Sequence, residues 1–249
     1  MSIFEKIFCC KKKELPIVDY SLINTDIHSH LIPGIDDGSK SLEESIDLIG
    51  KLKDLGYKRI ITTPHVMADG YNNSKEIILS GYEKLKNALV EANVDIKIEV
   101  SAEYNFDYGF EKLIENDEII PFAGNYVLIE LSYVNMPNNF ENIIFKLITK
   151  GFKPVLAHPE RYLYWANNID IFRELKNKGL LLQLNINSLS NFYSHVVKET
   201  AKKLVDAELI DFIGSDCHGE RHIDMMKTLI NNEYLYRLSI SPFLRNNKI

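Results

Sequence analysis

Seven short runs rich in β-branched and apolar residues alternate with longer amphipathic segments along this chain. This order is typical of βα units arranged around a mostly parallel sheet. The runs expected to form strands are Thr25 to His30, Arg59 to His65, Ile96 to Glu103, Tyr126 to Leu131, Lys153 to His158, Leu180 to Asn185 and Ile210 to Asp216. Seven such units in series favour a closed or nearly closed α/β barrel, whose active site lies at the carboxyl ends of the strands.

The segments between these runs carry helix signals. From Ser41 to Leu55 apolar residues recur at helical spacing, Ser41-x-x-Glu44 matches a capping box, and Gly56 follows as a C-cap. Further helices are expected over Ser74 to Ala92, Phe140 to Lys150, Asp170 to Lys178 and Val196 to Ala207.

Length and charge restrict the class of protein. The 249 residues suit one barrel domain, and neither an internal repeat nor a Pro/Gly/Ser-rich linker divides them. The net charge of −6 argues against nucleic-acid binding, because phosphate backbones need a basic face. We therefore expect a single domain over residues 19–249, preceded by an N-terminal extension over residues 1–18.

The cysteines indicate a reducing compartment. Cys9, Cys10 and Cys217 form neither a disulfide framework nor a CxxC metal site, and Cys217 is expected to be a structural thiol. No apolar stretch reaches the ~18 residues that a membrane span needs. The expectation is a cytoplasmic protein.

The two ends of the chain lie outside the recognisable motifs. Phe4, Ile7 and Phe8 precede Lys11 to Lys13, a pattern of either a frayed basic terminus or, at most, peripheral contact with a membrane or a partner. Residues after about 230 either pack on the barrel or meet a partner, and the sequence leaves this choice open.

Side chains that bind metals stand at the carboxyl end of almost every expected strand. In chain order they are His28 and His30, His65, Glu103, Glu130, His158, and Asp216 with His218. Surface residues distributed at random would not all fall at the carboxyl ends of the strands. We expect these side chains to converge from six strands on one mouth of the barrel, whereas His195 and His222 are interpreted as surface residues.

Two short patterns add to this set. In Asp26-Ile27-His28-Ser29-His30, alternate residues of a strand share a face, so two imidazoles offer adjacent ligands, and Asp26 is either a third ligand or a partner that orients an imidazole. In the Asp36-Asp37-Gly38 turn, one aspartate is in a position to bridge two ions.

Imidazoles and carboxylates without thiolates suit manganese, iron or zinc, and there are more candidate ligands than one ion uses. A cluster of two or three ions is therefore expected, with a bridging hydroxide suited to phosphoester hydrolysis. Arg161 and Arg221 each follow a candidate ligand by three residues. Because arginine presents a planar fork to phosphate oxygens, the pair favours a phosphoryl substrate over an amide.

Together these motifs resemble those of the PHP (polymerase and histidinol phosphatase) superfamily. The segments that carry the likeness lie between residues 24 and 221 and read DIHSHLIPGIDDGS, TTPH, SAEYN, LIEL, LAHPER, LNINSLS and FIGSDCH. The first and the AHPER segment resemble more narrowly the bacterial protein-tyrosine phosphatases of capsular and exopolysaccharide synthesis.

This resemblance implies a distorted (β/α)7 TIM-like barrel with three divalent ions, usually manganese, with iron or zinc as alternatives. The metal ligands it implies are His28, His30, Asp37, His65, Glu103, Glu130, His158, Asp216 and His218. It also implies that Arg161 and Arg221 bind phosphate, although a proline that commonly follows the second arginine is absent from the GERHID segment. The implied substrate is the phosphotyrosine tail of a membrane-associated bacterial tyrosine autokinase that controls polysaccharide synthesis.

The expected reaction is in-line attack on phosphorus by a metal-bridging hydroxide, with the arginines on the phosphate and His65 among the catalytic residues. The leaving phenolate has a reference pKa near 10, and either a histidine or a metal-bound water protonates it. Tyr104, Tyr162 and Trp165 are close to ligands in sequence and are interpreted either as stacking on the substrate ring or as packing residues.

Other readings make distinct predictions. A cysteine phosphatase needs arginine six residues after its cysteine, but Leu15, Pro16 and Ile223 stand there, which excludes it. A small-molecule phosphatase of the same superfamily, such as a histidinol-phosphate phosphatase, would prefer that substrate to phosphotyrosine. A scaffold without ions would hold no metal and would tolerate loss of His158.

Overall fold

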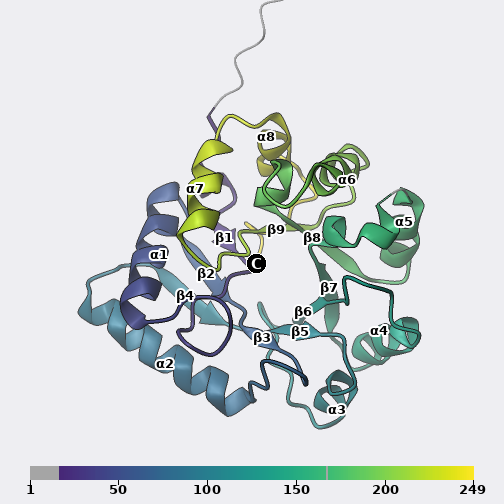
Figure 1. Ribbon diagram of the computed structural model, residues 1–249, viewed down its shortest axis with the longest axis horizontal. Helices are drawn as coiled ribbons and strands as arrows, with labels where there is room; N and C mark the ends of the chain where they lie inside the picture. The colour runs from purple at the N-terminus through teal and green to yellow at the C-terminus, as the bar shows by residue number, and fades with distance from the viewer. Residues whose placement is uncertain (1–16, 167) are drawn as a thin grey trace, which may run out of the picture.

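The computed structural model describes residues 17–166 and 168–249 as an α/β protein in which every ladder between named strands is parallel. One sheet has the order β1-β2-β4, with β1 Thr25–Asp26, β2 Arg59–Thr62 and β4 Lys97–Val100. The second has the order β3-β5-β6-β7-β8-β9, with β3 His65–Val66, β5 Glu103–Asn105, β6 Tyr126–Glu130, β7 Lys153–Ala157, β8 Leu181–Asn185 and β9 Phe212–Gly214. The strands surround a central axis and the helices lie outside them (Figure 1).

Two expected strands are each divided between the two sheets. The run from Arg59 to His65 breaks at Thr63-Pro64, and the run from Ile96 to Glu103 breaks at Ser101-Ala102. Proline has no N–H to continue a ladder, but the Pro64 carbonyl still accepts the Glu103 N–H at 3.0 Å. The two halves of each run therefore stay in line, and the second half carries the ligand-type residue at its start.

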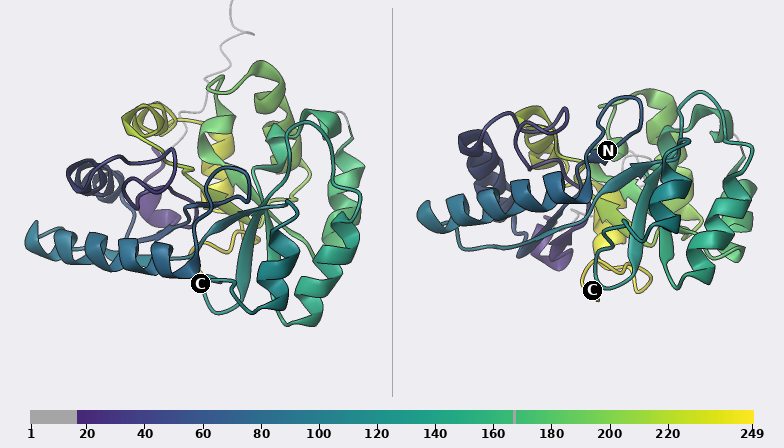
Figure 2. Two further views of the ribbon diagram at one scale, coloured as in Figure 1. Left: turned by 60° about the horizontal axis from the view of Figure 1, so that its bottom comes forward. Right: turned by 90° about the horizontal axis from the view of Figure 1, so that it is seen from below.

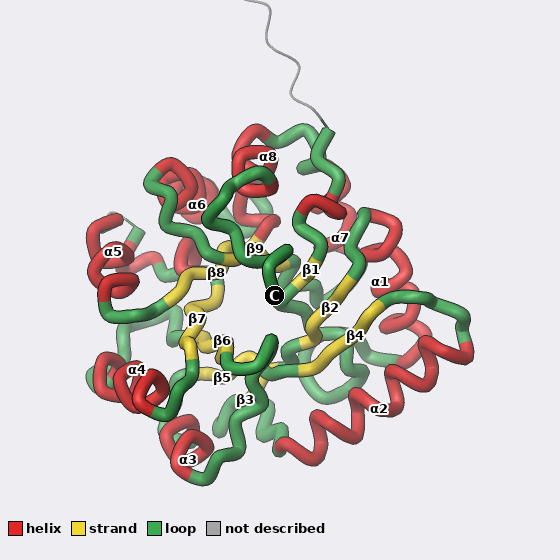
Figure 3. The backbone as a smooth tube through the Cα atoms, turned by 180° about the vertical axis from the view of Figure 1, so that it is seen from behind, coloured by secondary structure: helices red, strands yellow, loops and turns green. Residues whose placement is uncertain are grey.

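The first expected strand is also shorter than predicted, since regular pairing ends at Asp26. Beyond it, Ser29 forms a parallel bridge with Cys217, and the His30 N–H donates to the Cys217 carbonyl at 2.9 Å. The segment after β1 thus lies beside the segment after β9, so that the first and last strands of the chain are neighbours (Figure 3).

The five expected helices are confirmed to within two residues at each end. They are α1 Leu42–Leu55, α2 Lys75–Glu91, α4 Phe140–Thr149, α5 Ile169–Asn177 and α6 His195–Asp206. Three shorter helices were not expected, namely α3 Phe110–Glu115, α7 Glu220–Thr228 and α8 Glu233–Ser239, and 3-10 turns follow β7 and β8. In Figure 2, α2 extends along one side of the molecule, away from the strands.

The cap signals of α1 act as predicted, with one difference. The Ser41 hydroxyl accepts the Glu44 N–H at 3.2 Å, but the Glu44 carboxylate accepts from Lys40 at 2.8 Å rather than from Ser41. Gly56 ends the helix at φ 121°, a value that a side chain disfavours.

Both described ends of the chain pack on the body of the protein. The Val18 N–H donates to the Ile230 carbonyl at 2.7 Å, and Leu235 and Leu244 are buried in the core. Asn246 is fully buried beneath the strands, where its amide donates to the carbonyls of Thr25 and Ile213. Of the two alternatives for the residues after 230, packing on the body of the protein is confirmed, and contact with a partner stays a prediction.

The N-terminal apolar and basic residues, together with Cys9 and Cys10, lie outside the described residues. Within the described ranges, no helix combines the length and the apolar character needed to cross a membrane.

Candidate active site

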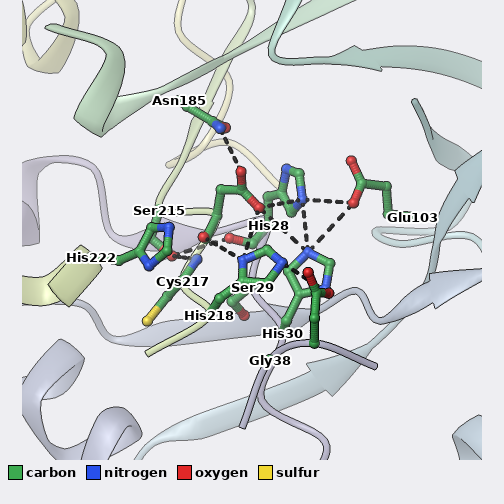
Figure 4. Close-up of polar contacts among 12 residues, drawn as sticks. His28, Ser29, His30, Gly38, Glu103, Asn185, Ser215, Cys217, His218 and His222 are labelled. Atoms are coloured by element: carbon green, nitrogen blue, oxygen red, sulfur yellow. Dashed lines mark hydrogen bonds and ion pairs between the residues drawn. The ribbon is translucent and has the colours of Figure 1, made fainter. Parts of the chain in front are cut away.

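A cavity of about 420 Å³ opens at the carboxyl ends of the strands. It is lined by Asp37, His65, Met67, Tyr71, Glu103, Glu130, Tyr133, His158, Arg161, Tyr193, Asp216, His218 and His222. His28 and His30 are fully buried, and they contact Glu103 and Asp216 of this lining (Figure 4). The predicted mouth of the barrel is where the ligand-type residues meet.

The first group surrounds the two histidines of the DIHSH segment. The Nε2 atoms of His28 and His30 are 3.2 Å apart. Glu103 Oε2 lies 3.2 Å from the first and 3.4 Å from the second, and Asp216 Oδ1 lies at the same two distances. Two imidazole nitrogens thus face each other between two carboxylates.

The second group stands nearer the opening. His65 Nε2 and His218 Nε2 each lie 3.5 Å from Asp37 Oδ1. The other ring nitrogen of His65 is 3.1 Å from Glu103 Oε2, and the His218 ring stacks on His30 with centroids 3.9 Å apart. Asp37 therefore connects two histidines that come from opposite ends of the chain.

The third group lies on the other side of Glu103. His158 Nε2 is 3.1 Å from Glu103 Oε1 and 3.5 Å from Glu130 Oε1. Glu130 Oε1 also accepts the Tyr133 hydroxyl at 2.6 Å. Glu103 is consequently shared by all three groups.

These distances fit metal ligands. Four overlapping groups of possible ligands have their atoms within 4.8 Å of one another, and together they comprise the nine residues expected as ligands. Bonds of about 2.0–2.2 Å to one ion place neighbouring ligand atoms at about 3.0–3.5 Å, the separation seen here. Glu103 Oε2 and His65 Nδ1 are buried, and although they lie 3.1 Å apart, neither atom has a contact among the described residues with the geometry of a hydrogen bond, as expected of atoms that bind a cation.

A second layer of side chains orients the histidines. The Gln183 Oε1 atom lies 2.8 Å from His28 Nδ1, and Asp36 Oδ2 lies 2.8 Å from His30 Nδ1. His218 Nδ1 is 2.9 Å from the main-chain carbonyl of Asp216. Each contact leaves Nε2 free to face the cluster, which is the usual arrangement around a metal-binding imidazole.

Gln183 and Asn185 were not expected from the sequence. Gln183 Nε2 donates to Asn185 Oδ1 at 2.9 Å, and Asn185 Nδ2 donates to Asp216 Oδ2 at 2.6 Å. Their signal was present, because two polar residues alternate within the otherwise apolar strand β8. Asp26, by contrast, does not reach an imidazole: its carboxylate accepts the N–H and the hydroxyl of Ser215.

Two of the ligand-type residues have an unusual backbone. His158 at the end of β7 has φ 35°, and Asp216 after β9 has φ 50°. Residues other than glycine rarely adopt this left-handed conformation, and it persists where the surroundings enforce it, often at functional sites. Both residues line the cavity.

Charge pairing dominates the buried cluster. Burial by itself disfavours the charged form of every group, but Glu103 and Asp216 outweigh it at His28 and raise its pKa to about 9. Burial likewise opposes ionisation of Glu103 and Asp216, yet the neighbouring histidines hold the pKa of both carboxyls well below the usual range. Without metal, a proton on His28 therefore supplies positive charge beside the two carboxylates.

The structure separates the two candidate phosphate-binding arginines. Arg161 lines the cavity, and its Nη1 atom lies 3.2 Å from Asp216 Oδ2. Arg221 is exposed near the start of α7, with its guanidinium carbon 5.0 Å from the centre of the Phe192 ring, and it does not line the cavity.

The aromatic residues at the cavity differ from those proposed to stack on a substrate. Tyr104, Tyr162 and Trp165 are buried packing residues, and the hydroxyls of the two tyrosines bond to the main chain. The rings that line the cavity are those of Tyr71, Tyr133 and Tyr193. They follow strands at distances along the chain that no local pattern specifies.

The predictions for the remaining histidines and for the buried cysteine are confirmed at two residues and wrong at one. His195 is exposed at the start of α6, as expected. The interpretation of His222 as a surface residue was wrong, because it is half-buried and lines the cavity, and burial lowers its pKa to about 4. Cys217 is fully buried, which agrees with a structural thiol.

Comparisons with known proteins agree with this site. The chain matches the model of the family described as capsular polysaccharide synthesis, CpsB/CapC, over residues 24–234. It is 30% identical over 228 residues to CapC of Staphylococcus aureus, which is described as a candidate tyrosine-protein phosphatase, and the match covers 90% of this chain and 89% of that one. It is 28% identical over 194 residues to tyrosine-protein phosphatase YwqE of Bacillus subtilis, covering 78% and 76%.

A solved structure supports the same relationship. The crystal structures of YwqE from Bacillus subtilis and CpsB from Streptococcus pneumoniae are described as those of unique metal-dependent tyrosine phosphatases. The match has a TM-score of 0.76 and 27% sequence identity, and it covers 84% of this chain and 87% of the solved one. From the family match and these relatives we conclude that this chain belongs to the CpsB/CapC family of capsular polysaccharide synthesis.

Proposed function

We propose that this protein is a metal-dependent tyrosine phosphatase that hydrolyses phosphotyrosine on proteins. The observation that carries the proposal is the convergence of four overlapping groups of metal-ligand residues with an arginine in one cavity. Cations and a fixed guanidinium in the same place suit a phosphoryl group. The relatives named above, described as tyrosine phosphatases, support the same substrate class.

The proposed metal ligands are the nine residues His28, His30, Asp37, His65, Glu103, Glu130, His158, Asp216 and His218. Their number and overlap suit three ions, and imidazole with carboxylate suits manganese, with iron or zinc as alternatives. When bound, such ions lower the pKa of water and neutralise charge on phosphate oxygens.

The chain's own residues bind and orient the substrate. Arg161 lies in the cavity and is the proposed phosphate-binding arginine, and a phosphate role for Arg221 stays a prediction. His65 lines the same cavity as Arg161 and is proposed as a catalytic residue as well as a metal ligand. Tyr71, Tyr133 and Tyr193 surround the entrance with rings that suit an aromatic substrate.

The arrangement of strands supports a seven-unit barrel as the frame of this site. Treating β2 with β3 and β4 with β5 as two bent strands leaves seven strands in chain order. The bridge between Ser29 and Cys217 then joins the first to the last. We propose that this is the distorted (β/α)7 barrel, formed by one domain over residues 19–249.

The proposed partner is a phosphotyrosyl protein, in particular the tail of a bacterial tyrosine autokinase that controls capsule or exopolysaccharide synthesis. The family description, which refers to capsular polysaccharide synthesis, supports this context. The cytoplasmic location expected from the cysteine content stays a prediction.

The experiment that tests the function compares initial rates on a phosphotyrosyl peptide, a phosphoseryl peptide and histidinol phosphate, with manganese and then with a chelator. We expect the phosphotyrosyl peptide to be hydrolysed fastest and the chelator to stop the reaction. Equal or faster hydrolysis of histidinol phosphate would instead assign the site to a small-molecule phosphatase.

A variant separates the enzyme from a scaffold that has lost its ions. His158→Ala should lower the rate by at least about a hundredfold, because it removes a group in contact with two carboxylates of the cluster. His195→Ala, at an exposed histidine, is the matched control and should behave like the parent. A metal-free protein whose His158→Ala variant matches the parent would be a scaffold.

A further inference from the structure

Two tyrosine rings pack on the guanidinium group of Arg161. The guanidinium carbon lies 4.8 Å from the centre of the Tyr133 ring and 4.4 Å from the centre of the Tyr193 ring. A cation over the face of an aromatic ring is attracted to it, more strongly where water is partly excluded. The Arg161 side chain is 24% exposed, so these contacts form at a partly desolvated place.

Each of the two rings is itself fixed by its hydroxyl. The Tyr133 hydroxyl donates to Glu130 Oε1 at 2.6 Å. The Tyr193 hydroxyl lies 3.4 Å from Asp216 Oδ2 and accepts from Asn185 Nδ2 at 3.3 Å. Both rings therefore contact carboxylates of the proposed metal cluster as well as Arg161.

The three residues come from three successive loops. Tyr133 follows β6, Arg161 ends the 3-10 turn Pro159–Arg161 after β7, and Tyr193 follows β8. Without the rings, the long arginine side chain would be free to turn toward the nearby carboxylates, where ion pairing would consume its hydrogen-bond donors. Among residues 17–166 and 168–249, Arg161 makes a single contact of this kind, from Nη1 to Asp216 Oδ2 at 3.2 Å.

We propose that Tyr133 and Tyr193 are positioning residues that hold the Arg161 guanidinium in the orientation that binds the phosphate group of the substrate. The inference rests on the proposed function for the identity of the substrate, but its content is the binding of phosphate. The two rings restrict the Arg161 side chain before phosphate binds, so that less conformational entropy is lost on binding. They would thereby strengthen phosphate binding without contacting the phosphate.

The test measures binding of inorganic phosphate to the full-length, manganese-loaded protein by isothermal titration calorimetry. Tyr133→Leu and Tyr193→Leu should each weaken phosphate binding by roughly five- to thirty-fold, the range expected for a lost cation–π contact. Tyr133→Phe and Tyr193→Phe lose the hydroxyl contacts but keep the ring, and should therefore weaken phosphate binding less than the leucine variants, by no more than about threefold. Tyr108→Leu, at an exposed tyrosine whose hydroxyl bonds to Asp69, should leave phosphate binding unchanged.

The same leucine substitutions made in an Arg161→Ala background distinguish positioning from a general structural role. With no guanidinium left to hold, each should change phosphate affinity by less than about twofold. A loss that persists undiminished in the Arg161→Ala background, or leucine variants that bind phosphate like the parent, would overturn the proposal. Thermal unfolding of each variant checks that it is folded, and Tyr133→Met and Tyr193→Met replace any leucine variant that is not.

Failure of this inference is separable from failure of the proposed function. If the parent protein does not hydrolyse the phosphotyrosyl peptide, the function is wrong, while the phosphate titrations still test the two rings. If the parent hydrolyses it and the rings prove uncoupled from Arg161, the function stands and only the positioning role is lost.

Discussion

At the scale of single residues, the geometry of the site depends on side chains that hydrogen-bond the histidines proposed to bind metal. Gln183 is fully buried and places its amide oxygen against His28 Nδ1. This contact selects the tautomer whose Nε2 atom faces Glu103 and Asp216. Removing the acceptor leaves a buried imidazole N–H without a partner and lets the ring turn.

We therefore expect Gln183→Leu to bind manganese about ten- to a hundredfold more weakly than the parent. The measurement is the manganese concentration that gives half-maximal hydrolysis, together with direct metal titration. Gln183→Glu retains an acceptor oxygen and should lie nearer the parent. Unchanged manganese affinity in Gln183→Leu would show that His28 is oriented by other means.

The two arginines also differ at this scale. Arg161→Ala should lower kcat/KM for a phosphotyrosyl peptide about ten- to a hundredfold, because a charge-assisted hydrogen bond in the cavity is lost. Arg221→Ala should change it by less than about threefold, since Arg221 is exposed and packs on Phe192 outside the cavity. Equal losses would mean that α7 carries Arg221 into the cavity when substrate binds.

At the scale of elements, the loop after His30 brings two aspartates to the cluster. Asp36 Oδ1 accepts the Gly38 N–H at 3.0 Å, and the turn passes so close to His30 that no side chain fits at Gly38. A Cβ atom there would lie 2.2 Å from the His30 carbonyl oxygen and 2.5 Å from its Cβ. Figure 4 shows the two residues side by side.

Gly38→Ala should consequently push the loop away from His30, lower the free energy of unfolding by about 1–3 kcal/mol and weaken manganese binding. Gly50→Ala is the matched control, because Gly50 lies within α1 with nothing within 4 Å of the added Cβ. It should stabilise the protein by up to about 1 kcal/mol. Chemical denaturation of both variants checks the contrast, which would fail if the two alanines had equal effects.

At the scale of the whole molecule, metal binding joins residues from six strands and should stabilise the folded chain. A single ion present at about a thousand times its dissociation constant adds about 4 kcal/mol, so that removal of even one ion by a chelator should lower the midpoint of thermal unfolding by about 8–16 °C. An unfolding midpoint that does not respond to chelator would contradict a metal site of this kind.

The difference between the unfolding midpoints with manganese and with chelator should depend on pH in one direction. In metal-free protein the pKa of His28 is raised to about 9, so its protonation stabilises the fold fully below pH 6.5 and less as the pH rises through 9. Metal binding needs deprotonated imidazoles and strengthens over the same range. The gap between the unfolding midpoints with manganese and with chelator should widen from pH 6.5 to 9. A gap that narrows would contradict the pairing of protonated His28 with Glu103 and Asp216.

Local sequence patterns were enough to predict most of the helices and strands and the residue types of the candidate metal ligands. The cap residues Ser41 and Gly56 lie where the sequence placed the ends of α1, because capping depends on a few consecutive residues. The division of strands at Pro64 was missed, since it results from pairing with a neighbour far along the chain. The short helices α3, α7 and α8 were missed because few apolar residues repeat within them.

The sequence by itself determined the order of βα units and the placement of imidazole and carboxylate side chains at the strand ends. Both follow from periodicity and from residue type, which are local properties. Only the tertiary structure decided that Arg161 enters the cavity and Arg221 does not, that Gln183 orients His28, and that Tyr133 and Tyr193 pack on Arg161. These contacts join loops that are 28 or more residues apart, and their geometry depends on how the loops fold against one another.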